Sequence, residues 1–413
     1  MNIDALKRDD PGLADLVASE WQRRQETLDL IASENLCPAS VREAVGSILT
    51  DKYAEGYPGN RWYGGCDVVD AVEQLAIDRG KDLFGADHIN VQPHSGSQAN
   101  MAVYFAALEP GATVLSMDLS HGGHLTHGKK ANFSGRLFHI AHYGVSPETE
   151  QIDYDVVADL ARQVKPAMII GGASSYPRQV DSARLAQIAG EVGALLMIDM
   201  AHFAGLVAGG VHPDPVPVSD FVTGTTHKTL RGPRGGFVLC KKAYAEAIDR
   251  TVFPGLQGGP LMHVIAGKAA SFALAMTDAF KAYQARIVAN ARAMAEEMAS
   301  LGYRLVSGGT DTHLFLVDLT PLGLTGGTAQ QWLGGAGIVL NKNVIPFDKR
   351  PAADPSGIRI GTPSMTTRGA REDDVRQVAR WIDQVLKADD PPAAAAAMRD
   401  DVLEFCRSHP IPD

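Results

Sequence analysis

The sequence lacks the features of several protein classes. Acidic side chains outnumber basic ones, 48 to 38, which gives a net charge of −10. Such a chain offers no basic surface, so we expect no nucleic-acid partner. No uninterrupted apolar run approaches the length of a membrane span, and the first residues lack the charged-then-apolar pattern of a signal peptide. We therefore expect neither a membrane partner nor a targeting segment.

Cysteine and nucleotide-binding motifs are also scarce. The 4 cysteines lie far apart and in no paired pattern, as is typical of reduced thiols in a cytoplasmic protein. We expect a cytoplasmic location. Gly267-Lys268 is not part of a Walker phosphate loop, because Met262 stands where the first glycine should be. No GxGxxG pattern follows a strand, so nucleotide chemistry is disfavoured.

What the chain does have is alternation of short apolar segments with amphipathic ones. This pattern predicts helices between successive strands and a mainly parallel sheet covered on both faces. The predicted strands are 89–92, 113–117, 168–171, 194–199, 220–223 and 236–240, with helices at 99–108, 154–163 and 182–193.

The flanking regions predict two further parts. An amphipathic helix over 11–30 precedes the sheet, and a long Ala- and Met-rich helical region over 262–301 follows it. Beyond it we expect strands near 303–307 and 313–318, helices near 328–334 and 369–386, and a spacer over 389–397 before a last helix. The predicted organisation is an N-terminal arm (1–50), a large cofactor-binding domain (51–280) and a smaller α/β domain (281–413).

Lys228 is the most informative single residue. It follows the apolar residues Phe221-Val222, is flanked by threonines and His227, and leads into a Gly/Pro turn. A surface turn would explain the lysine alone. A rigidly placed amine at a strand end is, however, what Schiff-base chemistry needs, above all with pyridoxal 5′-phosphate (PLP).

The other groups that a PLP site needs have candidates. Asp199 ends an apolar strand and could hold the pyridine nitrogen protonated, or merely cap the next helix. The segment Ser95-Gly96-Ser97 opens a helix, which suits a phosphate but also resembles an ordinary helix cap. His124 could lie flat on the ring; its run of histidines every three residues otherwise suggests metal, but two glycines and the lack of a carboxylate or cysteine disfavour that.

Substrate groups are also present. Arg359, on a short strand bounded by glycines, suits an amino-acid carboxylate, although a structural ion pair would account for it too. The loop from Tyr53 to Cys66 gathers aromatics, turn residues and Glu55. Glu55 could act as a general acid or base if burial raises its pKa.

These motifs together resemble the serine hydroxymethyltransferase family. The resemblance runs from about residue 30 to 386 and rests on long strings, among them LIASEN (30–35), KYAEGYPGNR (52–61), VQPHSGSQAN (91–100), HGGHLTHG (121–128), THKTLRGPRGG (226–236) and SGIRIGTP (356–363). It implies a PLP-dependent enzyme of the aspartate-aminotransferase-like fold (fold type I), working as a homodimer or dimer of dimers. The reaction would be reversible transfer of the hydroxymethyl group of L-serine to tetrahydrofolate, giving glycine and 5,10-methylenetetrahydrofolate.

The resemblance also implies a role for each matching residue. The catalytic set would be Lys228, Glu55, Tyr53, Tyr63 and His227, with Tyr53 and Glu55 supplied by a second subunit. The cofactor set would be Ser95, Gly96, Ser97, His124, Ser174, Asp199, His202, Thr225 and, from the second subunit, Gly259. The substrate and folate set would be Ser33, Arg359, Trp62, Leu119, Gly123, Leu125 and Asn343.

Two residues depart from the family pattern. Trp62 stands where the family normally has the first of two tyrosines, and Gly224 interrupts a run of threonines before His227-Lys228. We interpret Gly224 as opening a hole beside the substrate Cα. This predicts an alternative activity, that of an α-methylserine hydroxymethyltransferase, which converts 2-methylserine to alanine. A folate-independent β-hydroxy-amino-acid aldolase is a further alternative. A PLP-binding protein without catalysis is disfavoured, because Lys228, Asp199, Glu55 and Arg359 are all present.

Overall fold

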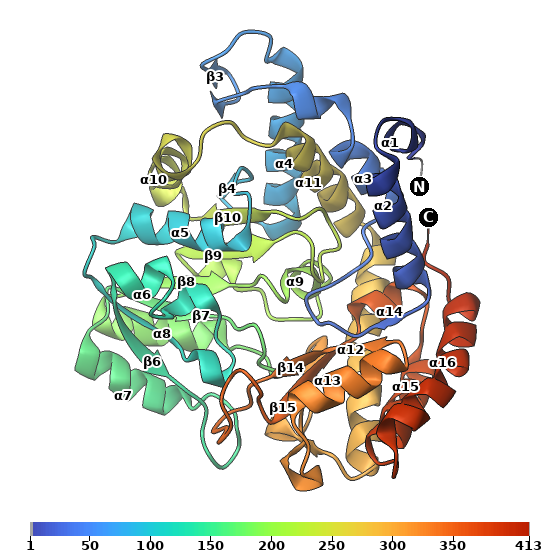
Figure 1. Cartoon of the computed structure of the whole chain (residues 1–413). Helices are drawn as coiled ribbons and strands as arrows, with labels where there is room; N and C mark the ends of the chain where they lie inside the picture. Colours follow the sequence, from blue (N-terminus) through green and yellow to red (C-terminus); the bar gives the residue numbers. More distant parts are fainter. Residues whose placement is uncertain (1–2, 413) are drawn as a thin grey trace.

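Seven strands form the central sheet, in the order β4-β10-β9-β8-β7-β5-β6 (Figure 1). The computed structural model describes residues 3–412; Met1, Asn2 and Asp413, at the outer ends of the predicted first and third parts, lie outside the described residues. The strands are β4 (His88–Asn90), β5 (Thr113–Met117), β6 (His139–Tyr143), β7 (Met168–Gly171), β8 (Leu195–Asp199), β9 (Phe221–Thr225) and β10 (Gly236–Cys240). Only β10 runs against the others, so the prediction of a mainly parallel sheet is confirmed.

Side chains of successive strand residues enter two separate cores, as the two-residue period of a strand requires. In β9, for example, Val222 joins one core and Phe221 the other. The first core lies under α4 (Asp67–Phe84), α7 (Tyr154–Val164), α8 (Ser182–Val192), α9 (Ala204–Ala208) and α11 (Met262–Ala275). The second lies under α5 (Gly96–Ala107), α6 (Phe133–Leu137) and α10 (Ala245–Arg250). Both faces of the sheet are thus covered.

A second, antiparallel sheet occupies the C-terminal part of the chain. Its order is β11-β12-β15-β14, from β11 (Arg304–Leu305), β12 (Leu314–Asp318), β14 (Asn341–Asn343) and β15 (Gly357–Gly361). It packs with α12 (Asp278–Ser300), α13 (Gly326–Gly335), α14 (Pro363–Thr367), α15 (Glu372–Leu386) and α16 (Pro391–Ser408) around a separate apolar core. The predicted α/β class is confirmed.

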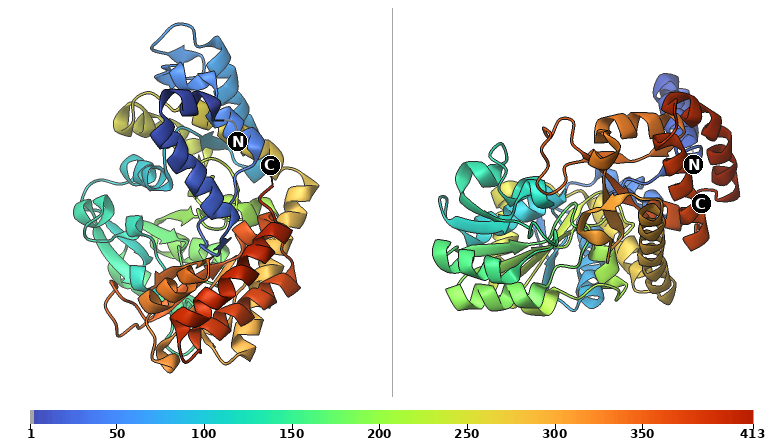
Figure 2. Two further views of the ribbon diagram at one scale, coloured as in Figure 1. Left: turned by 45° about the vertical axis from the view of Figure 1, so that its right-hand side comes forward. Right: turned by 90° about the horizontal axis from the view of Figure 1, so that it is seen from below.

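The N-terminal arm returns to the C-terminal part of the chain. After α1 (Asp4–Asp9), α2 (Pro11–Gln25) and β1 (Leu28–Asp29), the chain continues to α3 (Ala39–Val45). Strand β1 pairs in parallel with β13 (Ile338–Val339). Buried Arg368 fastens this junction, because its guanidinium donates to the carbonyl oxygens of Arg24, Gln25, Thr27, Cys406 and His409. The two ends of the chain consequently lie side by side (Figures 1 and 2).

Several sequence predictions need correction. The spacer predicted over 389–397 is wrong, because these residues belong largely to α16: Asp390 caps the helix, Pro391 occupies its first turn, and alanine favours the helix interior. The helical region over 262–301 is two helices, separated where Thr277 caps α12. The strand predicted over 303–307 is only Arg304–Leu305, followed by a 3-10 turn.

Other boundaries differ less. The arm helix ends at Gln25 rather than residue 30, and the strand predicted at 89–92 is His88–Asn90. Strand β6 escaped prediction because it is an edge strand with few fully buried residues. The hairpin strands β2 (Gly56–Tyr57) and β3 (Asn60–Arg61) lie within the aromatic loop. Within the described residues, no helix is both long and apolar enough to cross a membrane.

Candidate active site

A cavity of about 400 Å³ lies at the carboxyl ends of β8 and β9, between the large sheet and β15. This is the edge at which parallel α/β sheets bind ligands. It brings together Ser33, Ser95, Gly96, Ser97, His124, Ser174, Asp199, His202, Thr225, His227, Lys228 and Arg359, all of them predicted site residues. Glu34, Ala173, Ala201 and Arg234 complete the lining and were not predicted.

Asp199 is buried at the tip of β8 and is surrounded by donors. Its Oδ2 accepts hydrogen bonds from Asn100 Nδ2 at 2.8 Å and from His127 Nε2 at 3.1 Å, and its Oδ1 accepts from the Ala201 amide at 3.0 Å. Burial alone would raise the pKa of Asp199, but the hydrogen bond from His127 and the nearby imidazoles outweigh it and hold that pKa well below its usual value. The carboxylate therefore stays ionised and can face a cation in the cavity.

The hydrogen-bond network around Asp199 fixes the orientation of His124. Asn100 Nδ2 also donates to Thr126 Oγ1 at 2.7 Å, so the Thr126 hydroxyl is free to donate to His124 Nδ1, 2.7 Å away. The proton of a neutral His124 is thereby assigned to Nε2. Burial lowers the pKa of His124 to about 4. His124 is thus a neutral, tethered ring at the cavity wall.

His124, His127 and Asp199 also place their ligand-type atoms within 4.8 Å of one another. The hydrogen bonds account for this proximity, because His127 Nε2 donates to Asp199 while its Nδ1 accepts from the His124 amide at 3.2 Å. Both ring nitrogens of His127 are therefore engaged without an ion.

The N-terminus of α5 opens into the cavity. Ser95 caps the helix, its Oγ accepting from the Gln98 amide at 3.2 Å, and Gly96 and Ser97 form the first turn. A Cβ on Gly96 would lie 2.6 Å from the Thr225 methyl group, so only glycine allows the helix to approach β9 this closely. Free amide groups and the positive end of a 12-residue helix make this a site for an anion.

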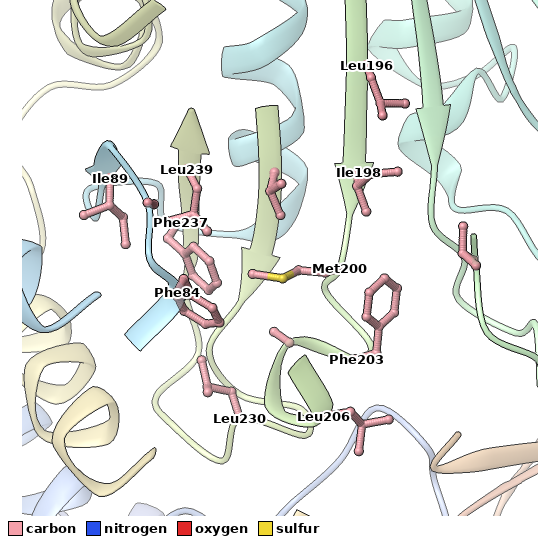
Figure 3. Packing of buried hydrophobic residues seen from close by; sticks show 14 of the residues in the cluster. Phe84, Ile89, Leu196, Ile198, Met200, Phe203, Leu206, Leu230, Phe237 and Leu239 are labelled. Carbon is pink, nitrogen blue, oxygen red and sulfur yellow. The ribbon is translucent and has the colours of Figure 1, made fainter. Parts of the chain in front are cut away.

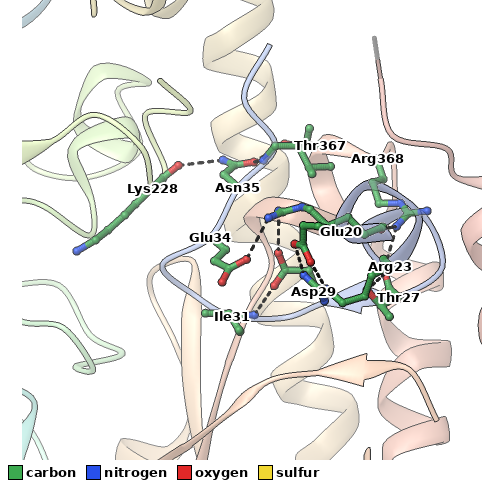
Figure 4. A network of polar contacts seen from close by, with 12 residues as sticks. Glu20, Arg23, Thr27, Asp29, Ile31, Glu34, Asn35, Lys228, Thr367 and Arg368 are labelled. Atoms are coloured by element: carbon green, nitrogen blue, oxygen red, sulfur yellow. Dashed lines mark hydrogen bonds and ion pairs between the residues drawn. The ribbon is translucent and has the colours of Figure 1, made fainter. Parts of the chain in front are cut away.

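Lys228 lies just beyond β9 with its amine in a buried, cationic setting. Burial, Arg359 and Arg234 lower the pKa of Lys228 to about 8, while Asp199 opposes the shift. The backbone carbonyl of Lys228 accepts a hydrogen bond from Asn35 Nδ2 at 3.0 Å, which ties it to the segment after β1 (Figure 4). Such an amine is partly neutral near physiological pH and can act as a nucleophile.

Arg359 lies across the cavity from the sheet. Its guanidinium donates to the Ser174 carbonyl at 2.6 Å and to Asn341 Oδ1 at 3.1 Å, and burial lowers its pKa to about 10. No carboxylate among the described residues pairs with it, so the ion-pair interpretation is not supported. A buried guanidinium with spare donors is a site for a carboxylate.

His202 is also buried at the cavity wall, and its Nδ1 lies 3.2 Å from Nε2 of His313, the residue before β12. Burial, with Lys228 and Arg359 nearby, holds the pKa of His202 well below its usual value. Burial likewise lowers the pKa of His227 to about 3. The imidazoles facing Lys228 are therefore neutral.

Nine predicted residues do not line this cavity in their own chain, and five of them lie on the aromatic loop or near it: Tyr53, Glu55, Trp62, Tyr63 and Gly259. Four of them form a second cluster, which we call the loop cluster. The rings of Tyr53 and Tyr63 lie 5.1 Å apart, and the Tyr53 hydroxyl lies 3.4 Å from Glu55 Oε1. A Cβ on Gly259 would lie 3.2 Å from the Tyr53 ring. Trp62 stands beside them with 77% of its surface exposed.

Comparisons with known proteins show matches over nearly the whole chain. The family model for serine hydroxymethyltransferase matches residues 6–382. A serine hydroxymethyltransferase of Myxococcus xanthus (strain DK1622) is 57% identical over 410 residues, which cover 99% of this chain and 98% of that protein.

The chain belongs to the serine hydroxymethyltransferase family. It is therefore a PLP-dependent transferase whose co-substrate is tetrahydrofolate, and the reaction is transfer of the serine hydroxymethyl group to leave glycine.

The cavity fits the cofactor of a serine hydroxymethyltransferase. An ionised Asp199, a neutral ring at His124, an anion site at Gly96 and a nucleophilic Lys228 are the four groups that PLP requires. A fifth, Arg359, remains available for the substrate.

Four residues predicted to contact folate lie outside the cavity lining. Leu119 and Leu125 are partly exposed on the two 3-10 turns that flank His124, Leu119–His121 and Leu125–His127. A Cβ on Gly123 would lie 2.3 Å from the Met117 carbonyl oxygen, so the turn before His124 requires glycine. Asn343 ends β14 and donates from Nδ2 to the Val344 carbonyl.

Gly224 does not open a hole beside the substrate, and that interpretation was wrong. Its neighbours Thr223 and Thr225 face α5, so Gly224 faces the opposite core. There it pairs across strands with Phe237, whose ring atoms would lie 2.3–2.9 Å from a Cβ at 224 (Figure 3). The Phe237 ring occupies the space that a side chain would fill. The structural argument for 2-methylserine is therefore lost.

The sequence reasoning missed the residues that hold Asp199. Asn100 lies one helical turn beyond Ser97, a spacing that could have pointed to it. His127 belonged to the histidine run but offered no sign of which histidine would reach Asp199. Neither partner is near Asp199 in sequence.

Proposed function

We propose that L-serine binds in this cavity with its carboxylate against Arg359 and Ser33, and that its hydroxymethyl group passes to tetrahydrofolate to give glycine and 5,10-methylenetetrahydrofolate. The observation that carries the proposal is Arg359, a half-buried cation that lines the same cavity as Lys228 and has no acidic partner among the described residues. A bidentate bond to the carboxylate would orient the amino group of serine toward Lys228.

When bound, PLP supplies an electron sink for the bond between Cα and the hydroxymethyl carbon. Asp199 keeps a negative charge opposite the pyridine nitrogen, and its three hydrogen bonds prevent it from turning away. The first turn of α5 would hold the phosphate through Gly96 and Ser97, and His202 and Ser174 would bind the phenolic oxygen. The tethered His124 ring provides a flat surface for stacking.

Proton transfer at the hydroxyl group or on folate is assigned to Glu55, supported by Tyr53 and Tyr63. In a single chain these groups lie in the loop cluster, outside the cavity lining. We infer that two copies of the chain form a homodimer, or a dimer of dimers, in which the loop cluster of one copy completes the cavity of the other. Two-fold symmetry allows both cavities to be completed in this way.

The remaining inferences concern the whole protein. Residues 51–280 would act as the large domain and 281–413 as the small one, with 1–50 as an arm. Trp62, Leu119, Gly123, Leu125 and Asn343 would contact folate, the exposed side chains of Leu119 and Leu125 offering apolar surface. The four cysteines carry free thiols, which supports a cytoplasmic location.

The test is cleavage of L-serine and of 2-methyl-L-serine by PLP-loaded protein, each with and without tetrahydrofolate. We expect glycine from serine, with a strong dependence on folate, and little alanine from 2-methylserine. Preferential formation of alanine would contradict the proposed substrate. Rapid cleavage without folate would indicate an aldolase instead.

A further inference from the structure

Lys268, on α11, is buried to 1% exposure, and its ammonium bonds only to the main chain. Its Nζ donates to the carbonyl oxygens of Val91, Pro93 and Gly236, at 2.5, 3.0 and 2.8 Å. Three acceptors match the three N–H donors of a protonated lysine. Burial lowers the pKa of Lys268 to about 7, and the charge of Glu73, which makes no ion pair with Lys268, opposes this shift. The three carbonyl groups thus satisfy every donor of the Lys268 ammonium in its protonated form.

The three carbonyl groups belong to the two segments that build the anion end of the cavity. Val91 and Pro93 lie between β4 and Ser95, the cap of α5. Gly236 begins β10, where the loop from Lys228 re-enters the sheet. The Gly236 amide also donates to the Pro93 carbonyl at 3.0 Å. One ammonium group therefore joins the segment before α5 to the loop that carries Lys228.

Two glycines of this loop, Gly235 and Gly236, allow the close approach of Lys268 and Ser95. A Cβ on Gly235 would lie 2.6 Å from Lys268 Cε, and one on Gly236 would lie 2.4 Å from the Ser95 carbonyl oxygen. Both segments can approach the lysine only because these positions lack side chains. An apolar residue of the same length would remove one donor from each of the three carbonyl groups, leaving the Pro93 carbonyl with the Gly236 amide, and the segments would relax apart.

We propose that Lys268 is a positioning residue for the cofactor phosphate, holding the Ser95–Ser97 turn and the Lys228 loop in register through its three hydrogen bonds. The proposal rests on the assignment of this turn as the phosphate site. It also gives a role to the Gly267-Lys268 pair, which resembles part of a nucleotide-binding motif but serves a different site.

The test compares two probes, PLP and pyridoxal, which lacks the phosphate, in titrations of the apoenzyme. Removing hydrogen bonds to a charged group near the phosphate should weaken PLP binding by about 10-fold to 100-fold in Lys268→Met. Pyridoxal binding should change by less than about 3-fold, because pyridoxal has no group at this end of the cavity. Lys268→Gln retains two donors and should give an intermediate loss for PLP.

Asn290→Ala is the matched control for general destabilisation, since Asn290 is buried and hydrogen-bonded to Thr366 and Ala370, away from both segments. It should leave the ratio of PLP to pyridoxal affinity unchanged.

An unchanged ratio in both Lys268 variants, or an equal change in Asn290→Ala, would overturn the proposal. If the wild-type protein itself did not prefer PLP over pyridoxal, the phosphate assignment would fail with it. Serine cleavage by the wild type, measured separately, shows whether the proposed function fails too. Should Lys268→Met not fold, Lys268→Gln alone decides.

Discussion

Lys228 has an amine whose surroundings differ from those of a surface lysine in every respect that matters for reactivity. Burial of the amine is the main cause that lowers the pKa of Lys228, and the Arg359 and Arg234 guanidinium groups add to it. The Asp199 carboxylate opposes the shift but does not cancel it. The amine is thus prepared to lose its proton where a free lysine would keep it.

This gives a pH prediction. Only the neutral amine attacks an aldehyde, so the rate at which apoenzyme captures PLP should rise with pH and reach half its maximum near the pKa of Lys228, about 8. A model amine of lysine type should have its midpoint near about 10.4. In Arg359→Met, the loss of a neighbouring cation should raise the midpoint. Stopped-flow absorbance over a range of pH measures both, and a wild-type midpoint near that of the model amine would contradict the assignment.

At the scale of the element, the two faces of strand β9 have different roles. Thr223 donates to Asn100 Oδ1 at 2.6 Å and Thr225 to the Ala201 carbonyl at 3.0 Å, so both serve the cavity side. Gly224, between them, serves only the packing of the opposite core, where the Phe84 and Phe237 rings stack at 5.4 Å (Figure 3). A substitution at 224 therefore acts on packing rather than on substrate choice.

We predict that Gly224→Thr lowers the free energy of unfolding by about 1–3 kcal/mol through overpacking against Phe237. The ratio of serine to 2-methylserine cleavage should stay as in the wild type. The second change Phe237→Leu, which removes the clashing ring, should recover part of the lost thermal stability in the double variant. Thermal unfolding and the two cleavage rates check these points. A changed substrate ratio would restore the pocket interpretation of Gly224.

The elements also show what sequence patterns can predict here. Buried strands such as 113–117 and 168–171 match their predicted bounds, because a short and largely apolar segment bounded by turn residues fits a buried strand and is too brief for a buried helix. The helix over 391–408 was obscured by its two prolines, which are harmless only because they fall in the first turn. The face of Gly224 depended on strand register, which one residue would reverse.

The site follows the same rule. Residues whose chemistry shows in their own segment, such as Lys228 and Arg359, were found from local patterns. Those that act by contact with Asp199 were missed, since Asn100 and His127 lie 99 and 72 positions away in the chain. Only the fold specifies which of several polar residues meet.

At the scale of the whole molecule, the predicted catalytic and cofactor residues lie in two places, the cavity and the loop cluster. The loop itself is firmly held: Arg61 pairs with Glu73 at 2.6 Å and with Asp70 at 2.7 Å, and donates to the carbonyl groups of Ala54 and Gly56. A rigid loop carrying exposed catalytic side chains suits delivery to a second copy of the chain.

Mixing of two inactive variants tests this arrangement. Lys228→Ala disables the cavity and Glu55→Gln disables the loop cluster. If sites are shared, each mixed dimer has one fully intact site and one doubly altered site, so random exchange should restore about 25% of wild-type activity. If each chain supplies its whole site, mixing should restore none. Mixing Lys228→Ala with itself is the control.

The hydrogen bonds of Arg368 to segments near both ends of the chain have a consequence for folding during synthesis. Residues 24–27 leave the ribosome early, yet their hydrogen-bonding partner is Arg368, and β1 cannot pair with β13 until residues 338–339 have emerged. Chains begin to fold from the N-terminus as they are synthesised. In this chain, however, the segment around β1 cannot take its final position until the C-terminal part has been made. Ser33 and Asn35 follow β1 directly and contribute to the Lys228 site. The active site is therefore among the last parts of a nascent chain to assemble, and a truncated chain should hold the large sheet without a working enzyme.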